Sequence, residues 1–180
     1  MSEQLVLAPE KCIDCKACMM LCSKRRFDQY DLDLSAVNVF YFPEDKASVP
    51  VMCLQCEEAV CEKVCPTHAI TRGADGASTI DESRCIGCKF CVQACPMGMV
   101  IHSRNFNKIF KCDLCGGKPL CAAWCPAKAI TFVDTAAGAD RRKAAAGMLK
   151  AAPDSVMPPN QSSEQETAAQ ATSRFFNVSL

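Results

Sequence analysis

The distribution of cysteine is the feature that most constrains how this chain can fold. The 180 residues include sixteen cysteines, and all sixteen fall into four groups of four. The first and third groups read C-x2-C-x2-C-x3-C, whereas the second and fourth have four and five residues in the middle gap. In chain order the groups are Cys12, Cys15, Cys18 and Cys22; Cys53, Cys56, Cys61 and Cys65; Cys85, Cys88, Cys91 and Cys95; and Cys112, Cys115, Cys121 and Cys125.

This spacing predicts iron-sulfur clusters. Three cysteines in a short loop can ligate three iron corners of a [4Fe-4S] cubane, and the fourth corner needs a thiolate from elsewhere. The last cysteine of three groups is followed by proline, at Pro66, Pro96 and Pro126, whereas Ser23 follows Cys22. Because proline ends one local conformation and starts another, we expect this last cysteine to ligate a neighbouring cluster. The sequence therefore predicts four [4Fe-4S] clusters, with all sixteen cysteines as iron ligands.

Two other roles for the cysteines fit less well. Structural zinc takes a tetrahedral ligand set built from two separated pairs, and a third cysteine so soon after the second suits that geometry poorly. Disulfides persist in oxidising compartments. The N-terminal segment MSEQLVLAPE has no basic region before an apolar stretch and no twin arginine, so we expect a reducing, cytoplasmic location.

Charge and motif content argue against several other classes of function. Twenty basic residues are balanced by twenty acidic ones, so the chain lacks the basic excess of a nucleic-acid-binding protein. No apolar run approaches the roughly 18 residues that a membrane span needs, so we expect no direct membrane insertion. The sequence has no P-loop, no dinucleotide-binding glycine motif and no nucleophile with a matching base, which predicts a non-catalytic protein.

The segments between the cysteine groups predict an α+β fold. Residues 69–72 and 77–80 are strand-like runs around a turn, and residues 99–103 and 129–133 are similar runs after the third and fourth groups. Residues 88–95 are expected to include a brief helix. Short strands, short helices and cluster loops in this order are typical of a ferredoxin-like two-cluster module, used here twice. Aromatic residues make up only 7% of the chain, so bound metal is expected to supply much of the folding energy.

Residues 12–126 resemble the four-cluster iron-sulfur electron-transfer subunits of modular oxidoreductases. This family includes subunits of dimethyl sulfoxide reductase, formate dehydrogenase, formate hydrogenlyase and tungsten aldehyde oxidoreductase. The shared signature is the widened second and fourth cysteine groups on either side of a regular third, and it covers about two thirds of the chain. The resemblance implies a subunit that relays single electrons between a tungsten- or molybdenum-containing catalytic subunit and a second redox subunit, such as a flavoprotein or a ferredoxin.

The family also implies a nested ligand pattern, in which group one pairs with group four and group two with group three. Spacing alone leaves the pairing open, since 19 residues separate Cys65 from Cys85 and 16 separate Cys95 from Cys112. The implied ligand sets are Cys12, Cys15, Cys18 with Cys125; Cys112, Cys115, Cys121 with Cys22; Cys53, Cys56, Cys61 with Cys95; and Cys85, Cys88, Cys91 with Cys65. The expected core is residues 1–133, with one ferredoxin-like module, of about residues 50–106, nested inside the other.

Composition changes after Val133. Within residues 134–180, an alanine-rich stretch to residue 152 predicts a helix, and the polar, prolyl residues that follow predict a flexible tail. The tail ends on an apolar cluster of Phe175, Phe176, Val178 and Leu180. We expect this end to dock on another subunit or on a second copy of the chain. The tail and the 30 residues between Cys22 and Cys53 favour a subunit over a free-standing polyferredoxin carrier. Within the family, the chain most resembles the small iron-sulfur subunit of a tungsten aldehyde oxidoreductase.

Side chains near the cysteine groups are expected to act on the clusters. Trp124 is expected to pack over a cluster and exclude water or, if it is exposed, to anchor a partner. Some basic residues are expected to raise the potential of the nearest cluster or to steer an acidic partner. Basic residues close to the groups include Lys11, Lys16, Lys24, Arg25, Arg26, Arg84, Lys89, Lys111 and Lys118.

Overall fold

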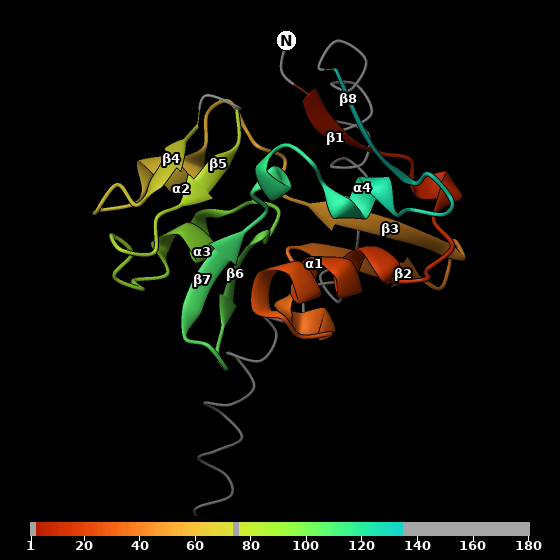
Figure 1. The fold of residues 1–180 in the computed structure, drawn as a ribbon, viewed down its shortest axis with the longest axis horizontal. Helices are drawn as coiled ribbons and strands as arrows, with labels where there is room; N and C mark the ends of the chain where they lie inside the picture. Colours follow the sequence, from red (N-terminus) through yellow and green to blue (C-terminus); the bar gives the residue numbers. More distant parts are fainter. Residues whose placement is uncertain (1–2, 74–75, 135–180) are drawn as a thin grey trace, which may run out of the picture.

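Four antiparallel strand pairs, joined by short helices, make up the fold. The computed structural model describes residues 3–73 and 76–134, so most of the predicted C-terminal helix and all of the predicted tail lie outside the described residues. Within the described part, strands β1 to β8 pair two by two, and four α-helices and three 3-10 turns connect them (Figure 1). This is the predicted α+β arrangement of short strands, short helices and cluster loops.

The two ends of the described chain pair with each other. Strand β1 (Glu3–Leu7) runs antiparallel to β8 (Ile130–Asp134), with Leu7 opposite Ile130, and the red β1 lies beside the cyan β8 in Figure 1. Both side chains of this last pair are buried. Cys12 lies five residues after Leu7, and Cys125 lies five residues before Ile130. The pairing therefore brings the first and fourth cysteine groups to the same place.

The longest helix of the described residues begins inside the first group, and a hairpin follows it. Helix α1 (Ala17–Phe27) contains Cys18 and Cys22. A 3-10 turn at Leu32–Leu34 leads into β2 (Val37–Phe42), which pairs with β3 (Ala47–Met52). Strand β3 ends immediately before Cys53, so this hairpin delivers the chain from the first group to the second.

The second and third groups are joined by the predicted hairpin. Helix α2 (Val60–Lys63) lies in the second group, β4 (Ile70–Arg72) pairs with β5 (Ser78–Ile80), and α3 (Phe90–Ala94) lies in the third group. A further hairpin of β6 (Val100–Ser103) and β7 (Lys108–Lys111) leads to the fourth group and its helix α4 (Leu120–Ala123). This hairpin spans residue 106, where the inner module was expected to end.

The cysteines are part of the apolar core. One cluster of buried side chains contains Leu5, Ile101 and Phe110 together with Cys112 and Cys121. A second cluster contains Cys65 and Cys91, and Cys53 and Cys95 pack against a third cluster around Met99. Cysteine side chains thus line parts of the interior that larger apolar side chains fill in most proteins. A cofactor held by these residues would complete the core.

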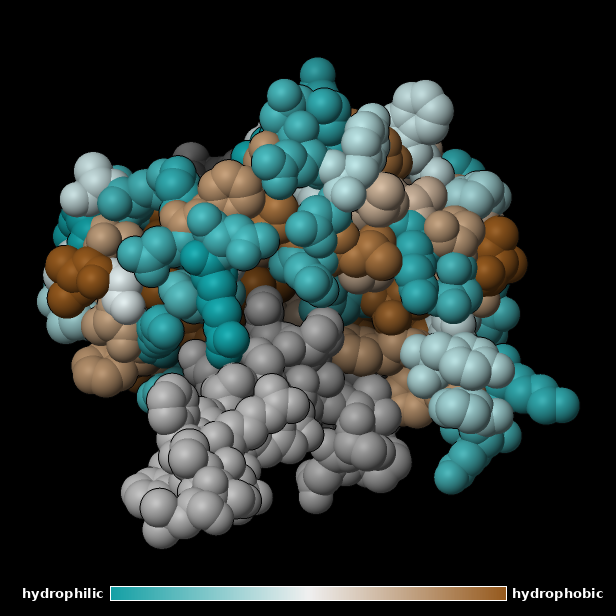
Figure 2. All heavy atoms as spheres, turned by 90° about the horizontal axis from the view of Figure 1, so that it is seen from below, coloured by the Kyte–Doolittle hydropathy of each residue, from teal (hydrophilic) through white to brown (hydrophobic). Residues whose placement is uncertain are grey.

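The surface combines polar and apolar side chains. Figure 2 shows a face on which hydrophobic residues lie between hydrophilic ones. None of the helices within residues 3–73 and 76–134 is both long enough and apolar enough to cross a bilayer. Three large apolar side chains beside cysteine groups are strongly exposed, namely Ile13 (65%), Ile86 (68%) and Trp124 (67%). For Trp124, this exposure favours contact with a partner over packing in the interior.

Candidate iron-sulfur centres

One pocket is lined by cysteines from both ends of the core. These are Cys12, Cys15, Cys18 and Cys125, called set A below. Burial, together with the nearby Cys12, Cys15 and Cys125 sulfurs, raises the pKa of the Cys18 thiol to about 12. The first three residues come from the loop before α1 and its first turn, and the last follows α4. The β1–β8 pairing positions both segments.

Two further pockets lie in the inner part of the fold. The first is lined by Cys53, Cys56, Cys61 and Cys95, called set C. The second is lined by Cys65, Cys85, Cys88 and Cys91, called set D. Each set combines three cysteines of one group with the last cysteine of the other. Helices α2 and α3 pack against each other, which holds the two groups together.

The remaining four cysteines gather in the interior between α1 and α4. They are Cys22, Cys112, Cys115 and Cys121, called set B. Burial raises the pKa of the Cys112 thiol to about 12, and the neighbouring Cys22 sulfur contributes to the shift. The pKa of Cys121 is raised by burial and then by Cys112, Cys22 and Cys115. Cys112 and Cys121 also share one buried apolar cluster, and Cys22 packs against it.

Every cysteine group has the same unusual backbone conformation at one position. The residue immediately before the second cysteine has a left-handed conformation in all four groups. These residues are Asp14 (φ 55°), Gln55 (φ 51°), Gly87 (φ 71°) and Leu114 (φ 53°). Left-handed backbone costs roughly 1–2 kcal/mol for a residue with a Cβ. Three of the four groups therefore hold a strained residue at this point, and such strain clusters where a ligand is bound.

A second left-handed residue follows the last cysteine of groups two, three and four. The third residue after it is left-handed, at His68 (φ 50°), Gly98 (φ 62°) and Lys128 (φ 54°). In groups two and three the next backbone N–H then donates to the cysteine, with 3.3 Å from Ala69 N to Cys65 Sγ and from Met99 N to Cys95 Sγ. His68 thus serves the turn through its backbone, which accounts for its place between loop and strand.

Three of the last cysteines accept a backbone hydrogen bond at sulfur, and at Cys65 this lowers the pKa. Burial alone would raise the pKa of the Cys65 thiol, but bonds from the Thr67 hydroxyl and the Ala69 N–H hold it below its ordinary value. In the first group, the Ala36 N–H donates to Cys22 Sγ at 3.3 Å. Cys65, which group two gives to another set, is therefore stabilised as an anion, the form that binds iron.

The sulfur positions fit cubane clusters better than single ions. All sixteen cysteines are free thiols. Within residues 3–73 and 76–134, no three Cys, His, Asp or Glu side chains converge closely enough to hold one metal ion. The sulfurs instead surround a space, as the separated iron corners of a cubane require, whereas zinc needs four donors directed at one point.

Family comparisons agree with this geometry. A family model described as a 4Fe-4S dicluster domain matches residues 44–135, just over half of the chain, and one described as a 4Fe-4S binding domain matches residues 9–26. The chain belongs to the 4Fe-4S dicluster family. Its cofactors are four [4Fe-4S] clusters, for which the sixteen cysteines provide the full number of thiolate ligands.

Characterised relatives of this 4Fe-4S dicluster protein are electron-transfer subunits. It is 32% identical over 145 residues to one subunit of the anaerobic dimethyl sulfoxide reductase of Escherichia coli (strain K12), covering 68% of each protein. It is 34% identical over 147 residues to the thiosulfate reductase electron transfer subunit PhsB of Salmonella typhi, covering 73% of this protein and 76% of the relative. Its role is accordingly electron transfer and not catalysis.

A solved structure shows a weaker likeness. The active site complex BamBC of benzoyl coenzyme A reductase with benzoyl-CoA includes a chain that is 21% identical, with a TM-score of 0.44. The match covers 86% of the dicluster protein and 92% of that chain.

Sets A and B, sets B and C, and sets C and D of the dicluster protein are neighbours. Beyond burial and its own set, the Cys18 sulfur of set A also raises the pKa of Cys121 in set B. In the same way, burial and then the Cys53 sulfur of set C raise the pKa of Cys112 in set B. Cys61 of set C packs against the apolar cluster that contains Cys65 of set D. These neighbour relations give the order A, B, C, D.

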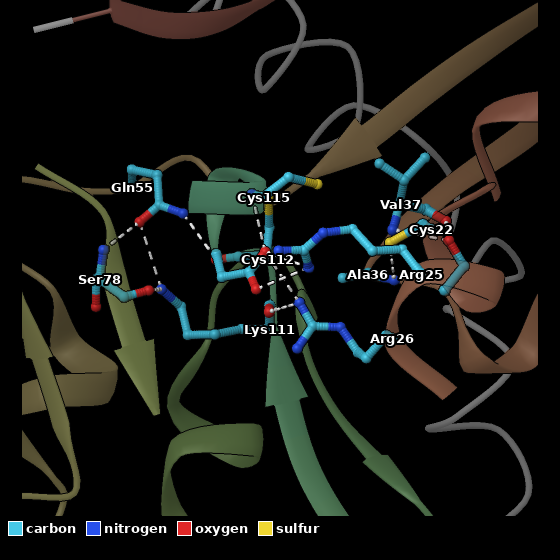
Figure 3. Close-up of polar contacts among 12 residues, drawn as sticks. Cys22, Arg25, Arg26, Ala36, Val37, Gln55, Ser78, Lys111, Cys112 and Cys115 are labelled. Atoms are coloured by element: carbon cyan, nitrogen blue, oxygen red, sulfur yellow. Dashed lines mark hydrogen bonds and ion pairs between the residues drawn. The ribbon is translucent and has the colours of Figure 1, made fainter. Parts of the chain in front are cut away.

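A charged network ties set B to helix α1. Asp113 accepts ion pairs from Arg25 Nη1 at 3.1 Å and Arg26 Nη2 at 3.2 Å, and its Oδ1 accepts the Cys115 N–H at 2.9 Å (Figure 3). Burial alone would raise the pKa of Asp113, but the two arginines hold it below its ordinary value. Arg26 also donates to the Lys111 carbonyl at 2.9 Å. The network fixes the Cys112–Cys115 loop against the helix that carries Cys22.

Proposed function

We propose that this chain is the electron-transfer subunit of a molybdenum- or tungsten-dependent oxidoreductase, and that sets A, B, C and D each ligate one cluster. The neighbour relations between sets A and B, B and C, and C and D carry the proposal, because a continuous row of sites would let an electron pass through the molecule. A bound [4Fe-4S] cluster supplies reversible one-electron transfer. The chain's residues hold the sites in line, and the buried Cys112 and Cys121 keep water from the middle of the row.

Exposed apolar residues at the two ends of the row support two docking sites. Ile13 lies between Cys12 and Cys15 of set A, and Ile86 occupies the equivalent position in set D. Trp124 is exposed next to Cys125, and Phe90 is exposed in the third group. Large apolar side chains beside a redox site are typical of an interface. We propose that a catalytic subunit docks at one end and a flavoprotein or ferredoxin at the other.

The metal of the catalytic subunit distinguishes between the candidate partners. The resemblance of the cysteine pattern extends to tungsten aldehyde oxidoreductases, and we propose such an enzyme as partner. The relatives from dimethyl sulfoxide reductase and thiosulfate reductase support the broader class of reductases. Elemental analysis of the purified complex for tungsten and molybdenum decides between these partners.

We also propose a cytoplasmic location. Free thiols and thiolate ligands persist in a reducing compartment and are oxidised elsewhere. Fractionation of cells expressing the tagged chain tests this proposal, which fails if the chain is found in another compartment.

Purification of the tagged full chain under anaerobic native conditions tests the main proposal. We expect it to elute with a larger partner that contains molybdenum or tungsten, and we expect the partner's substrate to bleach the cluster absorption near 400 nm. The 19.5 kDa chain eluting alone and failing to accept electrons from a catalytic subunit would instead indicate a free-standing carrier.

Two matched variants test the docking sites. Ile13→Glu and Ile86→Glu place one charge at equivalent positions at opposite ends of the row. Each should weaken association with one partner at least tenfold and leave the other association and the iron content unchanged. Equal binding of both partners by both variants contradicts the two docking sites.

A further inference from the structure

The structure buries one lysine beside set C. Lys111 ends strand β7, is 2% exposed, and is the only charged residue in the buried set of the described residues. Its Nζ donates to the Ser78 carbonyl at 2.6 Å and lies 3.5 Å from Gln55 Oε1 (Figure 3). Lys111 also lines the pocket formed by Cys53, Cys56, Cys61 and Cys95.

No carboxylate balances this cation. Within residues 3–73 and 76–134, no Asp or Glu oxygen lies within ion-pair distance of Lys111. A buried ammonium group costs several kcal/mol unless it is paired with a negative charge. The thiolate ligands in the same pocket are the available anions. Burial raises the pKa of Cys61, and Lys111 is the largest influence in the opposite direction.

The lysine is held rigidly with respect to set C. Gln55 lies between Cys53 and Cys56, and its Nε2 donates to the Cys112 carbonyl at 2.8 Å. Its Oε1 accepts the Ser78 N–H at 2.9 Å, beside the ammonium group of Lys111. One glutamine therefore links the loop of set C, the buried cation and Cys112 of set B.

The cations near sets A and B are paired or partly exposed. Arg25 and Arg26 beside set B both pair with Asp113. Lys16, in the loop of set A, is 43% exposed and lies 4.0 Å from Asp14. A paired or hydrated charge acts weakly on its surroundings, because counterion and solvent screen it. Set C differs in having a cation that is both buried and without a carboxylate.

We propose that Lys111 tunes the row by raising the reduction potential of the cluster held by set C, which makes this site the preferred resting place of an electron. This inference rests on the ligand sets proposed above. A cubane with four thiolates carries a charge of about −2 when oxidised and about −3 when reduced, so a fixed cation favours the reduced state. One electron passes between neighbouring clusters, one being oxidised as the other is reduced.

Anaerobic redox titration followed by electron paramagnetic resonance tests the proposal on the full chain. In Lys111→Met, at a fixed potential, the reduced-to-oxidised ratio of one cluster should fall at least tenfold. This corresponds to a midpoint shift of at least 59 mV for one electron. The other three midpoints should shift by much less. Lys111→Gln, which retains a donor for Ser78 but carries no charge, should shift the same midpoint in the same direction.

Two control variants separate charge from shape and position. Lys63→Met also removes a cation near Cys61, but Lys63 is 62% exposed and pairs with Glu58 at 2.9 Å, so the midpoint should barely move. Lys111→Arg keeps the charge and should keep the midpoint close to that of the unaltered chain. If both neutral variants lose this one cluster while Lys111→Arg retains it, the proposal is also supported.

Three results would overturn the proposal. They are four unchanged midpoints in the iron-loaded neutral variants, an equal shift of all four midpoints, and loss of the cluster in Lys111→Arg as complete as in the neutral variants. Measuring the iron content of the unaltered chain distinguishes a failure of the Lys111 proposal from a failure of the proposed function. A chain without four clusters contradicts the function, whereas a fully loaded chain with unchanged midpoints contradicts only the role of Lys111.

Discussion

Removing the iron should unfold most of the described core. Each sheet has only two strands, and an isolated strand pair is marginally stable. Cys112 and Cys121 lie in the largest apolar cluster, so cluster loss leaves thiols around empty space. Structural metal sites contribute on the order of 10 kcal/mol, which is comparable to the whole stability of a small domain, about 5–15 kcal/mol. Circular dichroism during anaerobic chelation should therefore show loss of structure and of the cooperative thermal transition.

Reconstitution provides the control for this prediction. Adding iron and sulfide to the reduced, iron-free chain should restore both the spectrum and the transition. An iron-free chain that melts cooperatively within about 5 °C of the loaded protein, a shift worth only about 1 kcal/mol, would show that the polypeptide packs without its clusters.

Exchanging cysteines for alanine in pairs should reveal the nested ligand pattern. Cys65→Ala should alter one cluster signal, and so should Cys88→Ala, because both residues line set D. The double variant should then alter that same signal and no other. Combining Cys65→Ala with Cys56→Ala should alter two signals, because Cys56 lines set C. Electron paramagnetic resonance of the reduced proteins counts the altered signals.

The pairs are matched, because Cys56 and Cys88 are both the exposed second cysteine of their group. The outer sets allow the same experiment, with Cys125→Ala combined with Cys15→Ala or with Cys115→Ala. The first combination should alter one signal and the second two. If each last cysteine instead shares its signal with the first three cysteines of its own group, the nested pattern is wrong.

The cysteine spacing predicted the cofactor class, and the segments between the cysteine groups predicted the α+β arrangement, because both depend on local sequence. The hairpin around residues 73–76 and the brief helix at Phe90–Ala94 follow from turn residues and ligand spacing in the same way. The pairing of β1 with β8 joins residues more than a hundred positions apart, and a short apolar run such as residues 4–7 does not specify its partner.

The left-handed residues in the cysteine groups could hardly be predicted from the sequence. Of the four left-handed residues before the second cysteines, only Gly87 is a glycine, the residue for which this conformation costs little. Asp14, Gln55 and Leu114 are held there by surrounding structure, so composition could not identify them. A left-handed residue at the same position of each repeat becomes visible only when the four loops are compared in space.

The burial of the basic residues could not be predicted from the sequence either. The sequence placed nine basic residues near the cysteine groups without distinguishing among them. Lys16 and Lys24 are partly exposed. Lys111 is buried, because it ends strand β7, which packs against β5. Burial depends on contacts between distant strands, so it could not be inferred from the neighbours of Lys111 in the chain.

The iron and inorganic sulfide content of the full chain, purified anaerobically, tests the central claim most directly. Four cubanes predict about sixteen irons and sixteen sulfides per chain, with the broad absorption near 400 nm that such clusters give. A colourless protein that holds zinc between four thiolates, or a chain with iron for only one or two clusters after full reconstitution, would contradict it.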